Sequence, residues 1–205
     1  MGKTAADWDK AYAGDAPFGD RPCPGLVQAI ARLETPPSKA LMLADGDGRN
    51  GTWLATRGWT VTAVDYSPIA TEHARLRDKA ARVAVERIVA DLETWSPDGA
   101  SVALATILFL QLPADLRRRT LSAAIGALAP GGHLVLETFA GAPMPDTSLG
   151  PPEPVRWQMA ETRAWLREIE GVEEVEAFEG FARLDDGPRH TGTARILRLL
   201  ARRVA

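Results

Sequence analysis

The feature that most constrains this fold is a glycine turn between an apolar segment and a helical one. The apolar run is Ala40-Leu41-Met42-Leu43, and Gly46-Asp47-Gly48-Arg49-Asn50-Gly51 follows it with the spacing G-x-G-x-x-G. In a strand–turn–helix unit such glycines let the backbone approach a bound ligand closely. Asp65 ends the next β-branched segment, about 20 residues after Gly46, where a carboxylate is placed to bind ribose hydroxyls. The pattern predicts a site for an adenosine-containing ligand.

Strand-like and helical segments alternate over the first two thirds of the chain. The expected strands are 40–43, 60–65, 87–91, 101–110 and 133–139, and the expected helices between them are 49–57, 68–83 and 113–128. Such alternation predicts a parallel sheet with helices on both faces. Two closing β segments, 173–184 and 190–201, are joined tightly enough to form an antiparallel hairpin. We therefore expect an α/β, Rossmann-like sheet of seven mostly parallel strands.

Composition and charge exclude several function classes. The chain has 205 residues, 45% of them hydrophobic, and a net charge of −3, so it has no overall field to gather a polyanion such as nucleic acid. The single cysteine, Cys23, forms no internal disulfide, and no Cys/His cluster has zinc spacing. No apolar run approaches the length of a membrane span. We expect a cytoplasmic protein, monomer or homodimer, without metal or membrane contacts.

The acidic glycine turn distinguishes between two adenosine ligands. A dinucleotide would place its pyrophosphate against the turn, where Asp45 and Asp47 would repel it. S-adenosylmethionine carries a sulfonium and an ammonium group, and acidic residues suit that cation. The charge argument favours S-adenosylmethionine. An NAD-dependent oxidoreductase and a non-catalytic S-adenosylmethionine-binding protein remain the alternatives.

Several motifs resemble those of a known enzyme family. They are 43–50 in the glycine turn, 63–68 after the second strand, 90–92 after the third and 128–132 before the fifth. Together they resemble class I S-adenosylmethionine-dependent methyltransferases. The arm Trp8-Asp9-Lys10-Ala11-Tyr12 with Phe18-Gly19, and the segment 187–192, are similar to small bacterial methyltransferases of the tellurite-resistance and thiopurine types.

The resemblance implies a single methyltransferase domain over 1–205 in four parts. Residues 1–35 would form a helical arm or lid, and 38–139 the cofactor-binding core. The proline-rich 140–158 would be a loop at the acceptor, and 159–205 a helix and the closing hairpin.

It also implies roles for individual residues. Asp65 would bind the ribose hydroxyls, Asp91 the adenine amino group and Arg21 the cofactor carboxylate. The full set of implied cofactor residues is Arg21, Ala44, Asp45, Gly46, Gly48, Asn50, Asp65, Tyr66, Ser67, Asp91, Leu92 and Phe109. Two positions depart from the family: Ala44 replaces the usual first glycine of the turn, and Met42 replaces an acid in the first strand.

The acceptor is expected to be a small molecule methylated on an O, N, S or metalloid atom. Methyl transfer by in-line displacement needs mainly alignment and a dry pocket, so no catalytic triad or metal is required. The candidate acceptor-binding residues are Trp8, Tyr12, Phe18, Gln111, Phe139 and His190. His190 and Glu137 are the candidates for a general base, where the acceptor must lose a proton. The basic run Arg117-Arg118-Arg119 is expected to be a solvated helix face.

Overall fold

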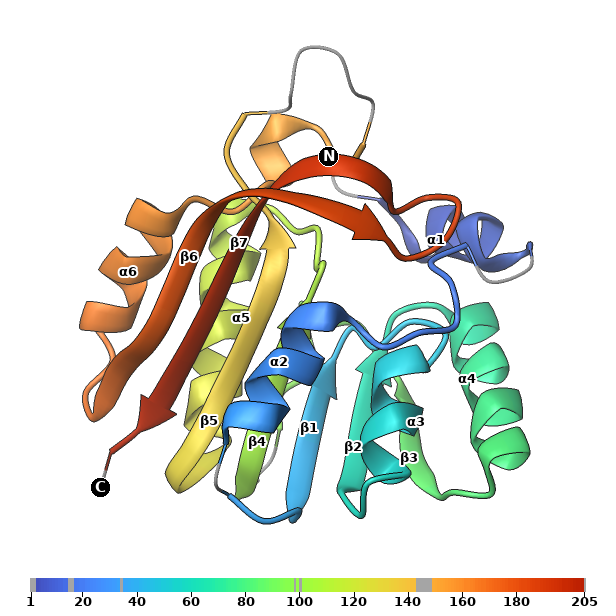
Figure 1. The fold of residues 1–205 in the computed structure, drawn as a ribbon, viewed down its shortest axis with the longest axis horizontal. Coiled ribbons are helices and arrows are strands. Elements are labelled where there is room, and N and C mark those ends of the chain that lie inside the picture. Colours follow the sequence, from blue (N-terminus) through green and yellow to red (C-terminus); the bar gives the residue numbers. More distant parts are fainter. Residues whose placement is uncertain are drawn as a thin grey trace.

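A seven-stranded sheet with helices on both faces forms the centre of the molecule (Figure 1). This computed structural model describes residues 3–14, 17–33, 35–97, 99, 101–142 and 149–204. The strands are β1 (Lys39–Leu43), β2 (Thr60–Asp65), β3 (Val85–Val89), β4 (Val102–Leu108), β5 (Leu128–Phe139), β6 (Val172–Asp185) and β7 (Thr191–Arg203). The helices are α1 (Ala5–Tyr12), α2 (Pro24–Arg32), α3 (Arg49–Ala55), α4 (Pro68–Ala81), α5 (Ala114–Gly126) and α6 (Met159–Arg167), with a short 3₁₀ helix η1 (Glu153–Val155).

The strand order is β3-β2-β1-β4-β5-β7-β6. The first five strands run parallel, and β7 enters antiparallel between β5 and β6. The chain moves outward in one direction from β1 and in the other from β4, so the carboxyl ends of these neighbours open a crevice at the switch point. The predicted seven-stranded sheet with an antiparallel closing hairpin is confirmed.

Two apolar clusters hold the helices on the sheet. Leu26 of α2 and Leu54 of α3 pack on one face, whereas Leu121 of α5 and Leu166 of α6 pack on the other. α4 lies beside α3 along β3 (Figure 1). Its start is fixed by Ser67, whose hydroxyl oxygen accepts the Ala70 N–H at 3.0 Å as an N-cap.

One predicted boundary is wrong. The segment 128–132 was expected to be a corner, but β5 already begins at Leu128, which pairs with Val102. The ladder then shifts register between Val102 and Leu104, and this irregularity accommodates the glycines of the corner within the strand.

The N-terminal arm is tied to the core by polar contacts. The Asp9 carboxylate of α1 accepts hydrogen bonds from the Ser67 hydroxyl and, at 3.3 Å, from the Ile69 N–H at the start of α4. Further along the arm, the Asn50 side-chain oxygen accepts the Cys23 N–H at 2.7 Å. The first helix of the arm, α1, therefore lies next to α4 at the carboxyl edge of the sheet, and the chain runs from there to α2 (Figure 1).

Candidate functional site

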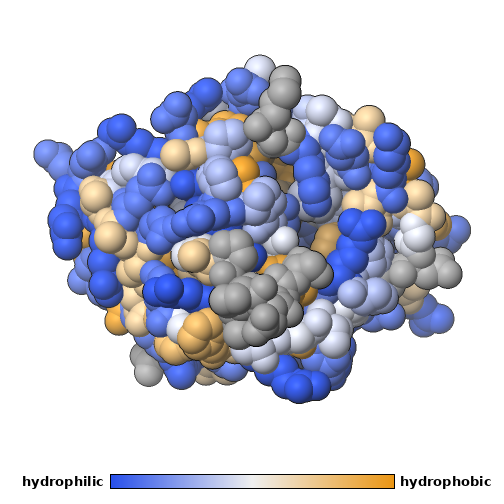
Figure 2. Space-filling view, turned by 90° about the horizontal axis from the view of Figure 1, so that it is seen from above, coloured by the Kyte–Doolittle hydropathy of each residue, from blue (hydrophilic) through white to orange (hydrophobic). Residues whose placement is uncertain are grey.

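A cavity of about 500 Å³ opens at the carboxyl ends of β1 to β4. Its walls come from the arm, the glycine turn, the ends of β2, β3 and β4, the first turns of α5 and the hairpin tip. The lining residues are Lys3, Thr4, Trp8, Tyr12, Phe18, Ala44, Asp45, Asp47, Arg49, Asn50, Asp65, Tyr66, 91–93, 108–113, Asp115, Leu116, Arg119 and His190. Seen from this end of the molecule, apolar side chains are visible between hydrophilic ones (Figure 2). The volume suits one ligand of cofactor size.

Asp65 lies at one end of this cavity, where β2 ends. Its Oδ2 accepts the Gly46 N–H at 2.7 Å and its Oδ1 accepts the Ser67 N–H at 2.9 Å. Burial raises the pKa of this carboxyl, although the amide donors oppose the rise. These two amides fix the orientation of the carboxylate, and each oxygen keeps lone pairs that could accept further donors.

The end of β3 provides a second carboxylate on the same side of the cavity. Asp91 Oδ1 accepts the Glu93 N–H at 2.8 Å, which holds the turn after β3 in place. Leu92 and Tyr66 line the cavity beside it. The parallel order β1-β2-β3 therefore brings Asp65 and Asp91 together at one sheet edge, as predicted from their positions after consecutive strands.

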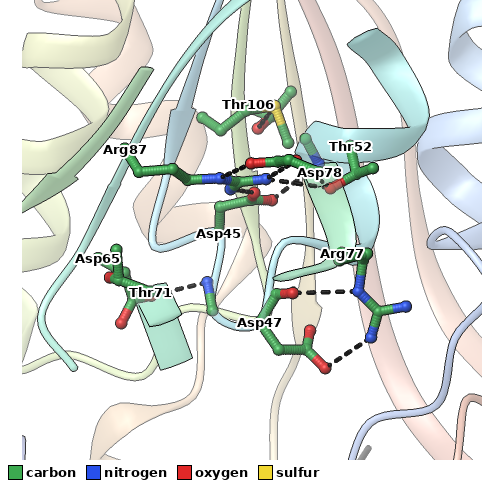
Figure 3. A network of polar contacts seen from close by, with 12 residues as sticks. Asp45, Asp47, Thr52, Asp65, Thr71, Arg77, Asp78, Arg87 and Thr106 are labelled. Carbon is green, nitrogen blue, oxygen red and sulfur yellow. Dashed lines mark hydrogen bonds and ion pairs between the residues drawn. The ribbon is translucent and has the colours of Figure 1, made fainter. Parts of the chain in front are cut away.

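The glycine turn is held from below by polar side chains (Figure 3). Asp45 is buried and pairs with Arg87 of β3, and Asp47 is buried and pairs with Arg77 of α4, Oδ2 to Nη2, at 3.2 Å. Each guanidinium also pairs with a second carboxylate, Asp78 for Arg87 and Asp20 for Arg77, so each cluster keeps more acidic than basic groups. The sequence spacing did not reveal these partners.

The two glycines of the turn have left-handed backbone and close neighbours. Gly46 has φ 58°, and a Cβ there would lie 2.3 Å from the Tyr12 hydroxyl oxygen. Gly48 has φ 82°, and a Cβ there would lie 2.6 Å from the Ala74 Cβ. A side chain at either position would clash, so the turn needs these glycines for packing as well as for conformation.

Two non-glycine residues beside the cavity also have positive φ. Ala44 follows β1 with φ 59°, and Phe109 follows the neighbouring β4 with φ 53°. L-residues rarely adopt this conformation, and it concentrates at ligand sites. The two positions mark the switch point between β1 and β4 as the strained centre of the site.

Two implied cofactor residues instead have structural contacts. Arg21 Nη2 pairs with Asp185 Oδ2 of the hairpin at 2.9 Å, and Arg21 is not among the residues that line the cavity. The implied contact of Arg21 with the cofactor carboxylate is therefore corrected: the hairpin returns over the arm and gives this guanidinium a carboxylate. Ser67, also outside the lining, caps α4 and holds α1.

Arg49 does line the cavity, although it was not among the residues predicted from the sequence. Its side chain is buried at the first position of α3, where Nη1 donates to the Arg21 carbonyl oxygen at 2.9 Å and lies 3.7 Å from Asp186 Oδ1. A cation at a helix N-terminus opposes the helix dipole. An arginine at a helix start, directly after the glycine turn, could therefore have been recognised in the sequence as a residue that needs an acidic partner or ligand.

The other end of the cavity is aromatic. Phe18 of the arm has its ring centroid 5.5 Å from Tyr12 and 4.7 Å from His190 of the hairpin tip. His190 in turn lies 4.6 Å from Phe109, and Trp8 lies 6.1 Å from Tyr12. Residues from both ends of the chain thus meet in one wall, and four of the predicted acceptor residues, Trp8, Tyr12, Phe18 and His190, are brought together.

The remaining predicted acceptor residues divide into lining and supporting positions. Gln111 lines the cavity, whereas Phe139 is fully buried behind the wall, 5.1 Å from Phe109, and does not line it. In the 140–158 loop, 143–148 lie outside the described residues. The described part of that loop is absent from the cavity lining, and Trp157 packs into the core with its Nε1–H donating to the Leu110 carbonyl oxygen at 3.1 Å.

The two candidate bases have different environments. His190 is buried, its Nδ1 has no protein partner among the described residues, and burial with the nearby Arg49 charge lowers its pKa to about 3. Glu137 is fully buried on β5, pairs with Arg198 at 2.9 Å and faces Gly25 of α2 rather than the cavity. Glu137 as a base is therefore corrected, because its carboxylate has a partner within the sheet.

Arg117 also differs from expectation. It was expected on a solvated face, but it is buried on α5 with its guanidinium 5.8 Å from the Trp157 ring and 3.0 Å from the Glu161 carboxylate. Its neighbour Arg118 is exposed and pairs with Glu168, in agreement with the expectation.

The described residues contain no group of three or more His, Cys, Asp or Glu side chains placed to hold a metal ion. None of their helices has the length and apolar character needed to cross a membrane.

Comparison with known proteins assigns the central part of the chain. Residues 40–132, which hold the glycine turn, Asp65 and Asp91, match the sequence profile of a methyltransferase domain. This segment is a methyltransferase domain. The match confirms the predicted enzyme class, a methyltransferase. No curated protein sequence matches the chain.

Several solved structures share the fold of this chain over most of its length. TehB from Haemophilus influenzae has 16% identity and a TM-score of 0.72, covering 98% of this chain and 67% of its own. A structure from a study of disulfide-to-thioacetal conversion in echinomycin biosynthesis has 21% identity and a TM-score of 0.71, with 96% and 90% covered. Magnesium protoporphyrin IX methyltransferase (ChlM) from Synechocystis PCC 6803, with bound SAH, has 18% identity and a TM-score of 0.63, with 87% and 79% covered. The resemblance to class I methyltransferases, TehB among them, is confirmed.

Proposed function

We propose that this methyltransferase acts on a small-molecule acceptor bound between the arm and the hairpin tip. The observation that carries the proposal is the division of one cavity into two ends. Carboxylates at the ends of β2 and β3 line one end, and aromatic side chains of the arm and hairpin line the other. The polar end is assigned to the cofactor, and the aromatic end to the acceptor.

The residues at the first end fit an adenosine-containing cofactor. We propose that the Asp65 carboxylate, already oriented by two amides, accepts the ribose hydroxyls, and that Asp91 and Leu92 receive the adenine. Arg49 takes the role first given to Arg21: it is a buried cation, and its Nε and Nη2 have no protein partner among the described residues. An unpaired guanidinium edge on a cavity wall suits a carboxylate such as that of the methionine portion.

The chain's own contribution to the reaction is alignment and exclusion of water. S-adenosylmethionine, when bound, supplies a methyl group on a sulfonium, which an acceptor displaces in line to leave S-adenosylhomocysteine. The Trp8, Tyr12 and Phe18 rings cover the space beside it and keep that space dry. His190 is unprotonated at neutral pH because its pKa is low, which makes it a weak base; its Nδ1, without a protein partner among the described residues, is instead available for a hydrogen bond that orients the acceptor.

The enclosure by two chain ends supports a small acceptor over a macromolecular one. The arm and the hairpin tip contact one another through the Arg189 N–H, which donates to the Pro17 carbonyl oxygen at 3.0 Å, and through Arg21 with Asp185. We propose the segment 1–35 as the lid over the core at 38–139. The net charge of −3 gives no field for a nucleic-acid substrate.

A methyl-transfer assay tests the proposal. The full chain is incubated with radiolabelled S-adenosylmethionine and a panel of small phenols, thiols, amines, aromatic heterocycles and metalloid oxyanions. tRNA and DNA are tested in parallel as macromolecular acceptors. Label in a small acceptor, lost in His190→Gln or Phe18→Ala, supports the proposal. Label in nucleic acid alone contradicts it. Tight S-adenosylmethionine binding without transfer to any acceptor would favour the non-catalytic alternative.

A further inference from the structure

Arg87 lies directly beneath the glycine turn, outside the cavity. Its side chain on β3 is buried, and its guanidinium reaches three other elements: the turn, α3 and α4 (Figure 3). Nε and Nη2 each donate at 2.9 Å to the two oxygens of Asp78, Nη2 also donates to the Thr52 hydroxyl at 3.1 Å, and Nη1 pairs with Asp45. All three nitrogen atoms of the guanidinium thus have acceptors in the glycine turn, α3 or α4.

Asp45 uses the fixed position to cap α3. The N-cap residue of α3 is Gly48, which has no side chain to accept the free amides of the first turn. Asp45 Oδ1 accepts the Gly51 N–H at 3.1 Å, and its carbonyl oxygen accepts the Gly48 N–H at 3.1 Å. Asp45 therefore shapes the turn whose upper side carries the Gly46 N–H to Asp65.

The glycines of the turn are in direct contact with this ion cluster. A Cβ at Gly48 would lie 2.7 Å from Arg87 Nη2, and a Cβ at Gly51 would lie 2.4 Å from Asp45 Oδ2. The ion cluster therefore leaves no room for a side chain at Gly48, where Arg87 would obstruct it, or at Gly51, where Asp45 would. Any movement of Arg87 is passed to the backbone that lines the cavity, because closely packed groups cannot shift independently.

We propose that Arg87 is a positioning residue for the cofactor. By holding Asp45, it keeps the backbone of the glycine turn in the position that S-adenosylmethionine binding requires. The role rests on the proposed placement of the cofactor over this turn. Arg87 acts through Asp45, since it has no surface on the cavity. Lysine cannot replace it fully, because one point charge cannot hold two carboxylates in the planar fork geometry.

The test is calorimetric titration of the full chain with S-adenosylhomocysteine, together with thermal unfolding of the unliganded protein. We expect Arg87→Met to weaken binding about tenfold or more, because small misplacements of a binding group have large effects. We expect Arg87→Lys to weaken it less. Arg198→Met is the matched control, since it also removes a guanidinium that pairs with a buried carboxylate, Glu137, and both residues lie outside the cavity lining.

The control separates positioning from general destabilisation. Lower thermal stability in both variants, with weaker binding only in the Arg87 variant, supports the role. Binding within twofold of wild type in folded Arg87→Met overturns it, as does an equal loss in Arg198→Met. If Arg87→Met does not fold because two buried carboxylates lose their partner, Arg87→Lys decides: a loss of threefold or more supports the role, and unchanged affinity overturns it. Absence of binding in the wild-type protein would overturn the proposed cofactor site and this role together.

Discussion

The two ends of the cavity are built in opposite ways. The cofactor end is made by consecutive segments, the turns after β1, β2 and β3, and its carboxylates are held by backbone amides and arginines. The acceptor end is made by aromatic rings that come from the first 18 residues and from the tip of the hairpin near residue 190. One end is local and polar, and the other is long-range and apolar.

This difference teaches which part of the site is tied to the fold. The cofactor end follows from a parallel sheet with a glycine turn, because strand order alone brings the acids together. The acceptor end depends on how two chain ends meet above that sheet, so it can vary without changing the core. Variants that affect cofactor binding and acceptor turnover separately therefore test whether the two ends have these roles.

The largest expected effect is at Asp65. We expect Asp65→Ala to weaken S-adenosylhomocysteine binding about 100-fold, because two hydrogen bonds to a charged acceptor are lost at roughly 1.5 kcal/mol each. Calorimetric titration measures this, with Glu86→Ala, an exposed acid on the neighbouring β3, as the control. Binding of Asp65→Ala within threefold of wild type would contradict the assignment of the cofactor end.

A pH dependence follows from the buried His190. Its pKa is lowered to about 3 by burial and by Arg49, from an ordinary value of 6.5. As pH falls below 6.5 the unfolded chain takes up a proton that the folded chain does not, so folded stability is lost. Relative to His190→Gln, the wild-type protein is expected to lose about 2 kcal/mol of unfolding free energy between pH 6.5 and 5. Parallel urea titrations at the two pH values check this; equal pH slopes would place His190 in a solvated setting.

At the acceptor end, Phe18 offers the sharpest contrast with Asp65. We expect Phe18→Ala to lower kcat/KM for the acceptor about tenfold through lost alignment, while S-adenosylhomocysteine affinity stays within threefold. Phe178→Ala on β6 removes a partly exposed ring away from the cavity and should change neither quantity. Loss of cofactor affinity in Phe18→Ala, at unchanged acceptor turnover, would mean that the cofactor binds at the aromatic end of the cavity and the acceptor at the polar end.

The smallest effect concerns the strained backbone at the border between the ends. Ala44 has φ 59°, so we expect Ala44→Gly to raise the unfolding free energy by about 0.5–1 kcal/mol. Arg82→Gly, at φ 57° beyond α4, should give a similar gain away from the site. Urea denaturation of both variants measures the gains. A destabilised Ala44→Gly would mean that the Ala44 methyl group makes packing contacts that outweigh the strain.

The sequence predicted that the acids after β2 and β3 lie at one sheet edge, but it did not reveal the polar partners. Asp65 and Asp91 were located by their positions after strands, which a parallel sheet converts into neighbours. Arg21 and Glu137 were assigned incorrectly because their partners, Asp185 and Arg198, are distant in sequence and reach them only through the inserted β7 hairpin. No local pattern encodes such a pairing.

Charged residues in unfavourable local positions were the missed signals. Arg87 shares one face of a short strand with Val85 and Val89, and Arg49 puts a cation at a helix start. Each is explained by buried acids, Asp45 and Asp78 for Arg87 and Asp186 for Arg49. Such residues can be marked from sequence as needing partners, but the identity of the partner requires the fold.

The central claim is that this cavity holds S-adenosylmethionine at its polar end. Calorimetric titration of the wild-type chain with S-adenosylhomocysteine, and with NADH in parallel, tests it most directly. The account predicts one site of micromolar affinity for S-adenosylhomocysteine, weakened in Asp65→Ala and unchanged in Phe178→Ala, and no binding of NADH. Binding of NADH alone, or S-adenosylhomocysteine binding that is indifferent to Asp65, would contradict it.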